Sequence, residues 1–201
     1  MRIIAGDFRG RKLQAAAGQV TRPTTDRIRE AWASSINSLL HAGLSETIVL
    51  DAFAGSGALG LEALSRGAAR CLFVEKERRA FNALKSNVQA LLGVGSQRGQ
   101  LLCADVLSAT TLAAVAGGGP YDLVVLDPPY GLPVGSILEL LSRLARVGAL
   151  ATGAVISLER RKADEDVLDG QVLCRACSPA SLHLVSSKAY GGIQIRYYRF
   201  A

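Results

Sequence analysis

The chain has 201 residues, of which 49% are hydrophobic, and a formal net charge of +6. This composition supports one continuous core, and no apolar run is long enough to cross a bilayer. The brief apolar run at the start is interrupted by Asp7, which argues against a signal peptide. We therefore expect a soluble cytoplasmic protein of one domain with a short appendage, and not a membrane protein.

The positive charge is concentrated at the start of the chain. Residues 1–30 hold a net charge of +4; their basic side chains are Arg2, Arg9, Arg11, Lys12, Arg22, Arg27 and Arg29. A basic region of this kind is typical of a protein that binds a polyanion, but a solubilising surface explains the charge equally well.

Residues 1–20 contain two short extended runs around a basic turn, and this pattern predicts a β-hairpin. We expect 1–22 to form a basic extension and 23–201 to form the main domain. The candidates for contact with RNA phosphates are the basic side chains of the turn, Arg9, Arg11 and Lys12.

Helices and strands then alternate along the chain. A helix is expected after Pro23, where Thr24, Thr25 or Asp26 can cap its exposed N–H groups. Strands are predicted at 48–50, 71–74, 101–103, 121–126, 154–158, 182–186 and 193–200, and the later helices at 59–66, 78–92 and 137–147. Apolar strands in βαβ order predict an α/β fold: a mostly parallel, Rossmann-like sheet of seven strands with helices on both faces and a C-terminal antiparallel hairpin.

Four of the predicted parallel strands are followed closely by an acidic residue: Asp51, Glu75, Asp105 and Asp127. Ligands of open α/β sheets bind outside the carboxyl ends of the strands, so we expect these side chains to line one crevice. A helix cap or a turn would explain any one of them alone. Four acids at equivalent positions favour a binding site.

A glycine-rich segment follows the first of these strands. Gly55, Gly57 and Gly60 match the pattern G-x-G-x-x-G, and Glu75 lies 20 residues after Gly55, which is also the dinucleotide-binding fingerprint. An NAD-binding Rossmann oxidoreductase is therefore a competing hypothesis. Asp51 argues against it, because a carboxylate repels a pyrophosphate but attracts the cationic ammonium and sulfonium of S-adenosylmethionine.

With S-adenosylmethionine in the crevice, the other acids have natural partners. Glu75 would accept hydrogen bonds from the ribose hydroxyls, and Asp105 would accept one from the adenine amino group. Phe53 and the first two glycines of the segment are expected to lie against the same cofactor.

The tetrapeptide Asp127-Pro128-Pro129-Tyr130 follows the strand at 121–126 directly. Its prolines fix the backbone and remove N–H donors, so the Pro128 carbonyl can point into the crevice. Together with Asp127 it would offer two acceptors to an amino group, while Tyr130 would stack on a base. A rigid turn with Tyr130 packed inside is the structural alternative.

The four cysteines do not predict a metal site. Cys71 and Cys103 lie in apolar strand-like runs and are expected in the core. Cys174 and Cys177 have C-x-x-C spacing, but zinc needs about four ligands and only His183 is nearby. We expect no bound metal.

In these motifs the chain resembles the class I methyltransferases that act on exocyclic amino groups, whose signature is [DNS]-P-P-[YFW]. More narrowly, it resembles the RsmD-type guanine-N2 methyltransferases of small-subunit (16S) ribosomal RNA. The resemblance extends over nearly the full length, and its segments are 2–6, 9–13, 22–31, 51–67 and 127–130. The chain departs from the family at Trp32-Ala33-Ser34, where an aliphatic or aromatic residue followed by Phe-Asn is usual.

The resemblance implies S-adenosylmethionine as the cofactor and a guanine of the assembled small subunit as the target. It assigns Asp127, Pro128 and Tyr130 to the reaction with the base. It also implies that Thr24 and Arg27 lie near the cofactor, where a helix N-terminus and an arginine suit its carboxylate.

Three further alternatives remain open at this point. DNA or RNA adenine-N6 methyltransferases use the same tetrapeptide, although no separate DNA-recognition domain follows Asp127. A glutamine-modifying protein methyltransferase more usually has asparagine at that position. A non-catalytic RNA-binding module would account for the basic region alone.

Overall fold

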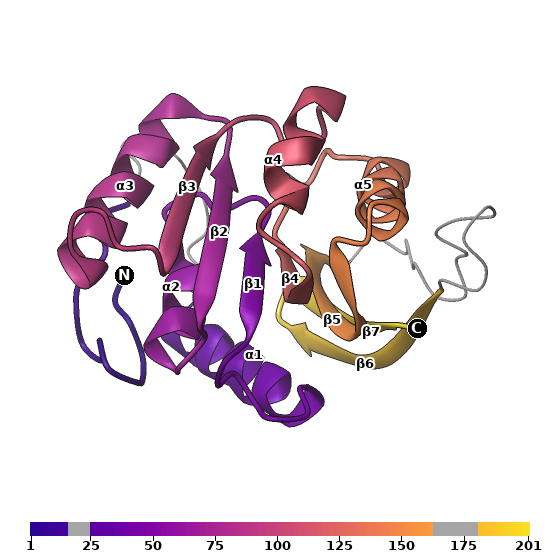
Figure 1. Ribbon diagram of the computed structural model, residues 1–201. Coiled ribbons are helices and arrows are strands. Elements are labelled where there is room, and N and C mark those ends of the chain that lie inside the picture. Colours follow the sequence, from indigo (N-terminus) through magenta and orange to yellow (C-terminus); the bar gives the residue numbers. More distant parts are fainter. Residues whose placement is uncertain (16–24, 163–180) are drawn as a thin grey trace.

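The computed structural model describes residues 1–15, 25–162 and 181–201, and their strands form one seven-stranded sheet. The strand order is β3-β2-β1-β4-β5-β7-β6 (Figure 1). The strands are β1 (Ile48–Asp51), β2 (Arg70–Glu75), β3 (Gly99–Cys103), β4 (Tyr121–Leu126), β5 (Leu150–Arg161), β6 (Leu182–Tyr190) and β7 (Ile193–Phe200). Strands β1 to β5 are parallel, and β7 pairs antiparallel with β5 and β6. The predicted Rossmann-like sheet with a C-terminal antiparallel hairpin is confirmed.

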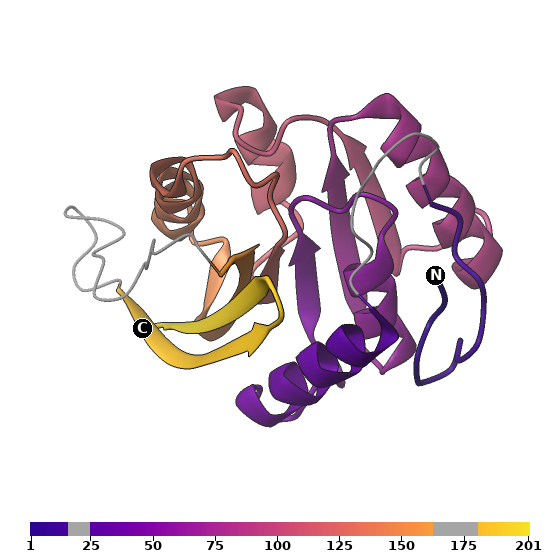
Figure 2. The same cartoon turned by 180° about the vertical axis from the view of Figure 1, so that it is seen from behind.

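Helices cover both faces of the sheet (Figures 1 and 2). One face carries α1 (Asp26–Leu39), α2 (Ala58–Ser65) and α3 (Arg78–Leu92), and the other carries α4 (Leu112–Ala116) and α5 (Val134–Arg146). A short 3-10 turn, η1 (Ala109–Thr111), leads into α4. The sequence did not predict η1 and α4, because they are too short to show a helical period.

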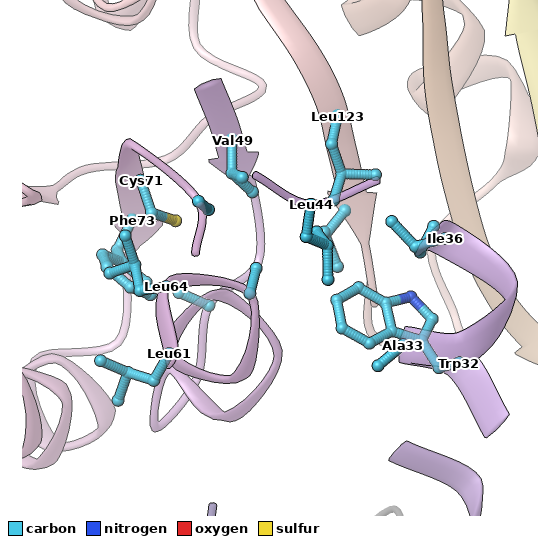
Figure 3. Close-up of a cluster of buried hydrophobic side chains, with 14 of the residues drawn as sticks. Trp32, Ala33, Ile36, Leu44, Val49, Leu61, Leu64, Cys71, Phe73 and Leu123 are labelled. Atoms are coloured by element: carbon cyan, nitrogen blue, oxygen red, sulfur yellow. The ribbon is translucent and has the colours of Figure 1, made fainter. Parts of the chain in front are cut away.

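A hydrophobic core between α1, α2 and the sheet holds these two helices against the strands. Trp32 and Ile36 of α1 and Leu61 of α2 are buried with Val49 and Phe73 of the sheet (Figure 3). Burial of each large side chain contributes about 1.5–3 kcal/mol to the free energy of folding. At the departure from the family pattern, Trp32 and Ala33 are therefore packed in the core, whereas Ser34 is exposed. The Trp32 indole N–H also donates to Ser157 Oγ at 2.9 Å.

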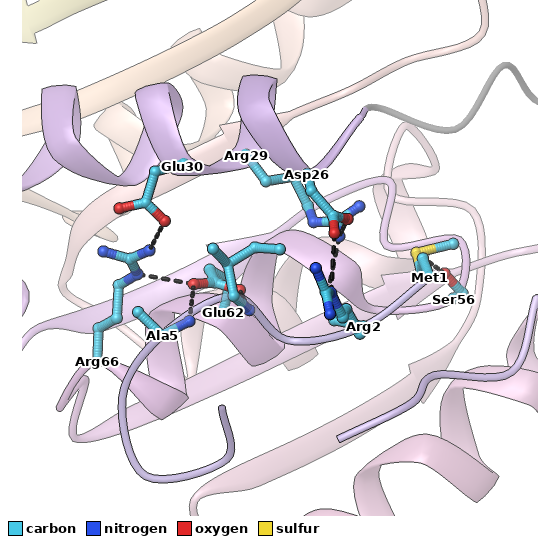
Figure 4. Close-up of polar contacts among 10 residues, drawn as sticks. Met1, Arg2, Ala5, Asp26, Arg29, Glu30, Ser56, Glu62 and Arg66 are labelled. Atoms are coloured by element: carbon cyan, nitrogen blue, oxygen red, sulfur yellow. Dashed lines mark hydrogen bonds and ion pairs between the residues drawn. The ribbon is translucent and has the colours of Figure 1, made fainter. Parts of the chain in front are cut away.

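The N-terminal segment packs along α2 and joins it to α1 (Figure 4). Glu62 of α2 is fully buried, and its carboxylate accepts the backbone N–H groups of Ile4 at 2.8 Å and Ala5 at 3.1 Å. Arg2 contacts Asp26 at the start of α1 at 2.9 Å. In the described part of the expected hairpin, an antiparallel bridge joins Arg2 and Lys12. Backbone hydrogen bonds flank it, from Ile3 N–H to the Arg11 carbonyl at 2.9 Å and from Leu13 N–H to the Met1 carbonyl at 3.0 Å.

Two predictions about cysteines have different outcomes. Cys71 on the inner strand β2 is buried, as expected, but the prediction for Cys103 was wrong. Cys103 ends the edge strand β3 and is exposed, because an edge strand has a neighbour on one side only. Cys174 and Cys177 lie outside the described residues.

Candidate active site

A pocket of about 880 Å³ opens at the carboxyl ends of the parallel strands. Its volume is within the range of small-ligand sites. Of the predicted site residues, those that line it are Phe53, Gly55, Glu75, Asp105, Asp127, Pro128 and Tyr130. Arg27, Asp51 and Gly57 are not among its lining residues, and Thr24 lies outside the described part of the chain.

The acids at the carboxyl ends of β2 and β3 are held by backbone donors. The two carboxylate oxygens of Glu75 accept the N–H groups of Gly55 at 2.8 Å and Glu77 at 2.7 Å. Asp105 accepts the N–H of Leu107 at 3.0 Å. Each oxygen keeps further acceptor capacity, so both side chains are oriented in advance and can still receive a ligand hydroxyl or amino group.

Asp51 has a different place from the one expected. It is the last residue of β1, is 2% exposed, and accepts the N–H of Gly60 at 3.0 Å. Burial raises the pKa of Asp51 to about 7, and the charges of Asp127 and Glu75 add to the rise. The expectation that all four acids line one crevice is therefore wrong for Asp51, which is buried near the lining acids Asp127 and Glu75 but does not line the pocket itself.

The glycine segment serves packing as much as ligand contact. Gly57 has φ +84°, and a Cβ there would lie 2.5 Å from Leu84 Cδ1. At Gly60 a Cβ would lie 2.4 Å from Phe73 Cε1. Gly57 therefore allows the start of α2 to approach α3, and Gly60 allows α2 to approach the sheet. Of the three, Gly55 lines the pocket.

The side of the pocket formed by β4 and β5 holds a pair of carboxyl groups. Glu159 of β5 is 5% exposed and lines the pocket with Asp127. The parallel register pairs Leu126 with Leu158, so the residues that follow, Asp127 and Glu159, are neighbours on one face of the sheet. Burial raises the pKa of Asp127 to about 6, and burial together with the Asp127 charge raises the pKa of Glu159 to about 8.

The end of β5 also braces the loop that follows β4. Arg160 donates to the Leu132 carbonyl at 2.7 Å, and the Arg161 guanidinium lies 4.4 Å from the centre of the Tyr130 ring. The Pro129 carbonyl accepts the N–H of Leu132 at 2.9 Å. These contacts hold the D-P-P-Y loop rigid at the mouth of the pocket, with a cation on one face of the tyrosine.

Sequence reasoning missed Glu159 and Arg161, although the signal for Glu159 was present. Glu159 directly follows the strand predicted at 154–158, which is the rule that selected the other acids. Arg161 had no comparable signal, because its contact with Tyr130 depends on the pairing of β4 with β5.

The basic turn contacts α2 and α3 and does not line the pocket. The N–H of Asp7 donates to the Ser65 carbonyl at 2.8 Å, and Arg11 donates to the Ala90 carbonyl at 3.0 Å. These contacts are at the C-terminal ends of α2 and α3. Arg9 and Lys12 are exposed. Two residues after Lys12, the N–H of Gln14 donates to Asn87, whose side-chain amide donates to the Ser56 carbonyl next to the pocket-lining Gly55.

Two negative findings apply to the described residues alone. None of their helices is long and apolar enough to span a membrane. They contain no cluster of three or more histidine, cysteine or acidic side chains that could hold a metal ion.

The sheet order, the pocket at its carboxyl edge and the D-P-P-Y loop define a Rossmann-like class I methyltransferase fold. Residues 1–199 match the family described as Conserved hypothetical protein 95. The chain belongs to this family, the RsmD family.

Named relatives agree with this assignment. Ribosomal RNA small subunit methyltransferase D of Escherichia coli strain K12 is 35% identical, over 99% of this chain and 89% of its own. The protein of the same name from Haemophilus influenzae is 32% identical, over 99% of this chain and 93% of its own. The solved structure of the E. coli protein yhhF superposes with a TM-score of 0.72 at 33% identity, covering 100% of this chain and 97% of that one.

Proposed function

We propose that this protein transfers a methyl group from S-adenosylmethionine to the exocyclic N2 amino group of a guanine in small-subunit ribosomal RNA. The names of its relatives support ribosomal RNA as the substrate. One observation carries the amino-group acceptor: the Asp127 carboxyl and the Pro128 carbonyl line the pocket, and no group among the described residues donates a hydrogen bond to either.

The other side of the pocket fits the cofactor. Glu75 would hold the ribose, Asp105 the adenine amino group, and Phe53 and Gly55 the adjoining surface. Thr24 and Arg27 remain proposed partners of the methionyl carboxylate, and Asp51 and Gly57 support the same region. When bound, S-adenosylmethionine supplies an electrophilic methyl group on a positively charged sulfur.

The acidity of the pocket favours this cofactor over a dinucleotide. Glu75, Asp105 and Asp127 line the pocket, and Asp51 is buried near two of them. A pyrophosphate would be repelled by these groups, whereas a sulfonium and an ammonium are attracted. An oxidoreductase would also leave the two acceptors at Asp127 and Pro128 without a role.

In this mechanism Asp127 and the Pro128 carbonyl accept hydrogen bonds from the two N–H groups of the amino group. The N2 lone pair of guanine is delocalised into the ring, and these two hydrogen bonds turn the lone pair toward the methyl group. As the bond from nitrogen to the methyl carbon replaces the bond from that carbon to sulfur, the nitrogen becomes positive, S-adenosylhomocysteine would leave, and Asp127 stabilises the positive charge or takes a proton from the nitrogen. Alignment of the reacting atoms by the rigid loop supplies much of the rate, and Tyr130 holds the base, which must leave its stack.

The test is methyl transfer from labelled S-adenosylmethionine to small ribosomal subunits that lack the modification, followed by identification of the methylated nucleoside. We expect N2-methylguanosine, and a rate about 100- to 1000-fold lower for Asp127→Ala with unchanged affinity for S-adenosylhomocysteine. Asp122→Asn is the matched control, because Asp122 lies at the other end of β4 and accepts the N–H of Ile48. A near-normal rate for Asp127→Ala, or label on another atom, contradicts the proposal.

A further inference from the structure

Glu159 is a buried acid in the pocket to which the reaction above gives no role. It is 5% exposed, and no group in the described ranges donates a hydrogen bond to its carboxyl or forms an ion pair with it. The carboxyl of Glu159 lines the pocket, so a ligand that enters the pocket can bring it a hydrogen-bond donor. Such a donor would stabilise an acid that burial has largely removed from water.

The geometry places Glu159 beside the group that grips the amine. Asp127 and Glu159 follow the paired residues Leu126 and Leu158 of two parallel strands. Neighbouring strands lie about 4.8 Å apart, and their paired residues point to the same face. An oxygen of Glu159 therefore lies within reach of the ring atom next to an amino group held by Asp127.

The bases differ at that ring atom. The amino group of guanine is flanked by N1–H, a donor, and by N3, an acceptor. The amino groups of adenine and cytosine have no ring N–H beside them, and the ring nitrogen next to each is an acceptor. A second acceptor beside Asp127 can therefore bind the N1–H of guanine. It would face and repel the ring-nitrogen lone pair of adenine or cytosine.

We propose that Glu159 selects the target base, by accepting a hydrogen bond from the N1–H of guanine while Asp127 holds the N2 amino group. This inference rests on the proposed function and adds to it the residue that distinguishes guanine from adenine.

The protonation state of Glu159 gives the proposal a second consequence. The titratable and charged groups around it are Asp127 on the neighbouring strand, Tyr197 on β7 and Arg161, which lines the same pocket. Both forms of Glu159 can accept from N1–H, but only the protonated form can donate to a base whose N1 is an acceptor. Since the pKa of Glu159 is raised to about 8, selectivity for guanine should increase as the pH rises toward and past this value.

The experiment uses small subunits reconstituted on RNA with either guanine or 2-aminopurine at the target position. 2-Aminopurine keeps the C2 amino group but has an acceptor at N1. We expect the wild type to prefer guanine in kcat/KM by about 10- to 100-fold, the value of one hydrogen bond to a charged group, and to prefer it more at about pH 8.5 than at about pH 6.5. Glu159→Met should lose the preference at both pH values, through a lower rate on guanine.

Glu159→Gln is the conservative variant, because its amide oxygen still accepts from N1–H. Its NH2 group can also donate to an acceptor at N1, as the protonated acid can, so this variant should show at both pH values the weaker preference of the wild type at low pH. Melting temperature and affinity for S-adenosylhomocysteine check that each variant is folded. The inference is overturned if Glu159→Met has the same ratio of kcat/KM for guanine to kcat/KM for 2-aminopurine as wild type. This holds whether its rates on the two bases are high or equally reduced, because Glu159 would then have a structural role only.

The two proposals fail in different ways. If the wild type places the methyl group on adenine N6, both are overturned. If it places it on guanine N2 and the Glu159 variants keep the wild-type ratio and its pH dependence, the inference alone is overturned.

Discussion

The two sides of the pocket differ in how their acids are held. On the side of β2 and β3, the carboxylates of Glu75, Glu77 and Asp105 each accept a backbone N–H at 3.0 Å or less. On the side of β4 and β5, no group in the described part of the chain donates a hydrogen bond to Asp127 or Glu159, although both line the same cavity. On the side of β2 and β3, the carboxylates have hydrogen-bond donors before a ligand binds. On the side of β4 and β5, the carboxyl groups are acceptors that a substrate can supply with donors.

This difference should be measurable first in the stability of the protein. Glu159 has its pKa raised from an ordinary value of 4.5 to about 8, so on raising the pH the unfolded chain loses this proton before the folded one does. The stabilising contribution is complete below about pH 4.5 and is lost as the pH rises through about 8. At about 1.4 kcal/mol per tenfold change in proton affinity, the loss amounts to a few kcal/mol.

We therefore expect the free energy of unfolding to fall from about pH 5 to about pH 8.5, and to fall by about 2–4 kcal/mol less in Glu159→Gln. Asp51, whose pKa is raised to about 7, leaves part of the fall in place. Glu139→Gln is the matched control, because Glu139 is exposed and its hydrogen bond with Arg143 lowers its pKa. Denaturant titrations at a series of pH values measure the effect, and parallel curves for Glu159→Gln and wild type would remove the contrast between the two sides.

Most of the fold could be predicted from the sequence because the strands are short, apolar and separated by periodic helices. The predicted bounds of α3, β4 and β7 agree with the observed ones. Strand β5 begins and ends several residues beyond its prediction, since polar residues such as Thr152 and Arg160 interrupt the apolar pattern at its ends.

The candidate site could be predicted as a set of strand ends, but not as a set of contacts. Whether a carboxylate after a strand faces a ligand depends on the N–H groups near it. Asp51, at the end of β1, accepts the N–H of Gly60 in the first turn of α2, and Glu75, at the end of β2, accepts the N–H of Gly55 in the loop after β1. Such partners lie far apart in the sequence, so the pattern alone cannot separate a buried acid from a binding one.

The next prediction concerns the side with complete hydrogen bonds. Glu75→Ala removes the acceptor for the ribose and frees the N–H groups of Gly55 and Glu77 that shape the loop. We expect about a 10- to 100-fold weaker affinity for S-adenosylhomocysteine by calorimetry, the cost of one or two hydrogen bonds to a charged group. Asp127→Asn should leave this affinity within about twofold of wild type. If Glu75→Ala and Asp127→Asn lose equal affinity for S-adenosylhomocysteine, the two sides of the pocket do not bind their ligands independently.

The smallest effect should come from the basic turn, which belongs to neither side of the pocket. Arg9 and Lys12 are exposed and are not among the residues that line the pocket, whereas Arg11 is engaged with the Ala90 carbonyl. If the turn contacts phosphates of the ribosomal RNA, Arg9→Ala or Lys12→Ala should raise KM about two- to fivefold and leave kcat and cofactor affinity unchanged. Each lost contact should reduce the slope of log affinity against log salt by about 0.7–0.9. Binding of the RNA measured at several salt concentrations gives this slope. If both variants have the same slope as wild type, the basic side chains of the turn serve solubility and do not contact phosphates. The pocket would then bind its RNA without a contribution from the turn.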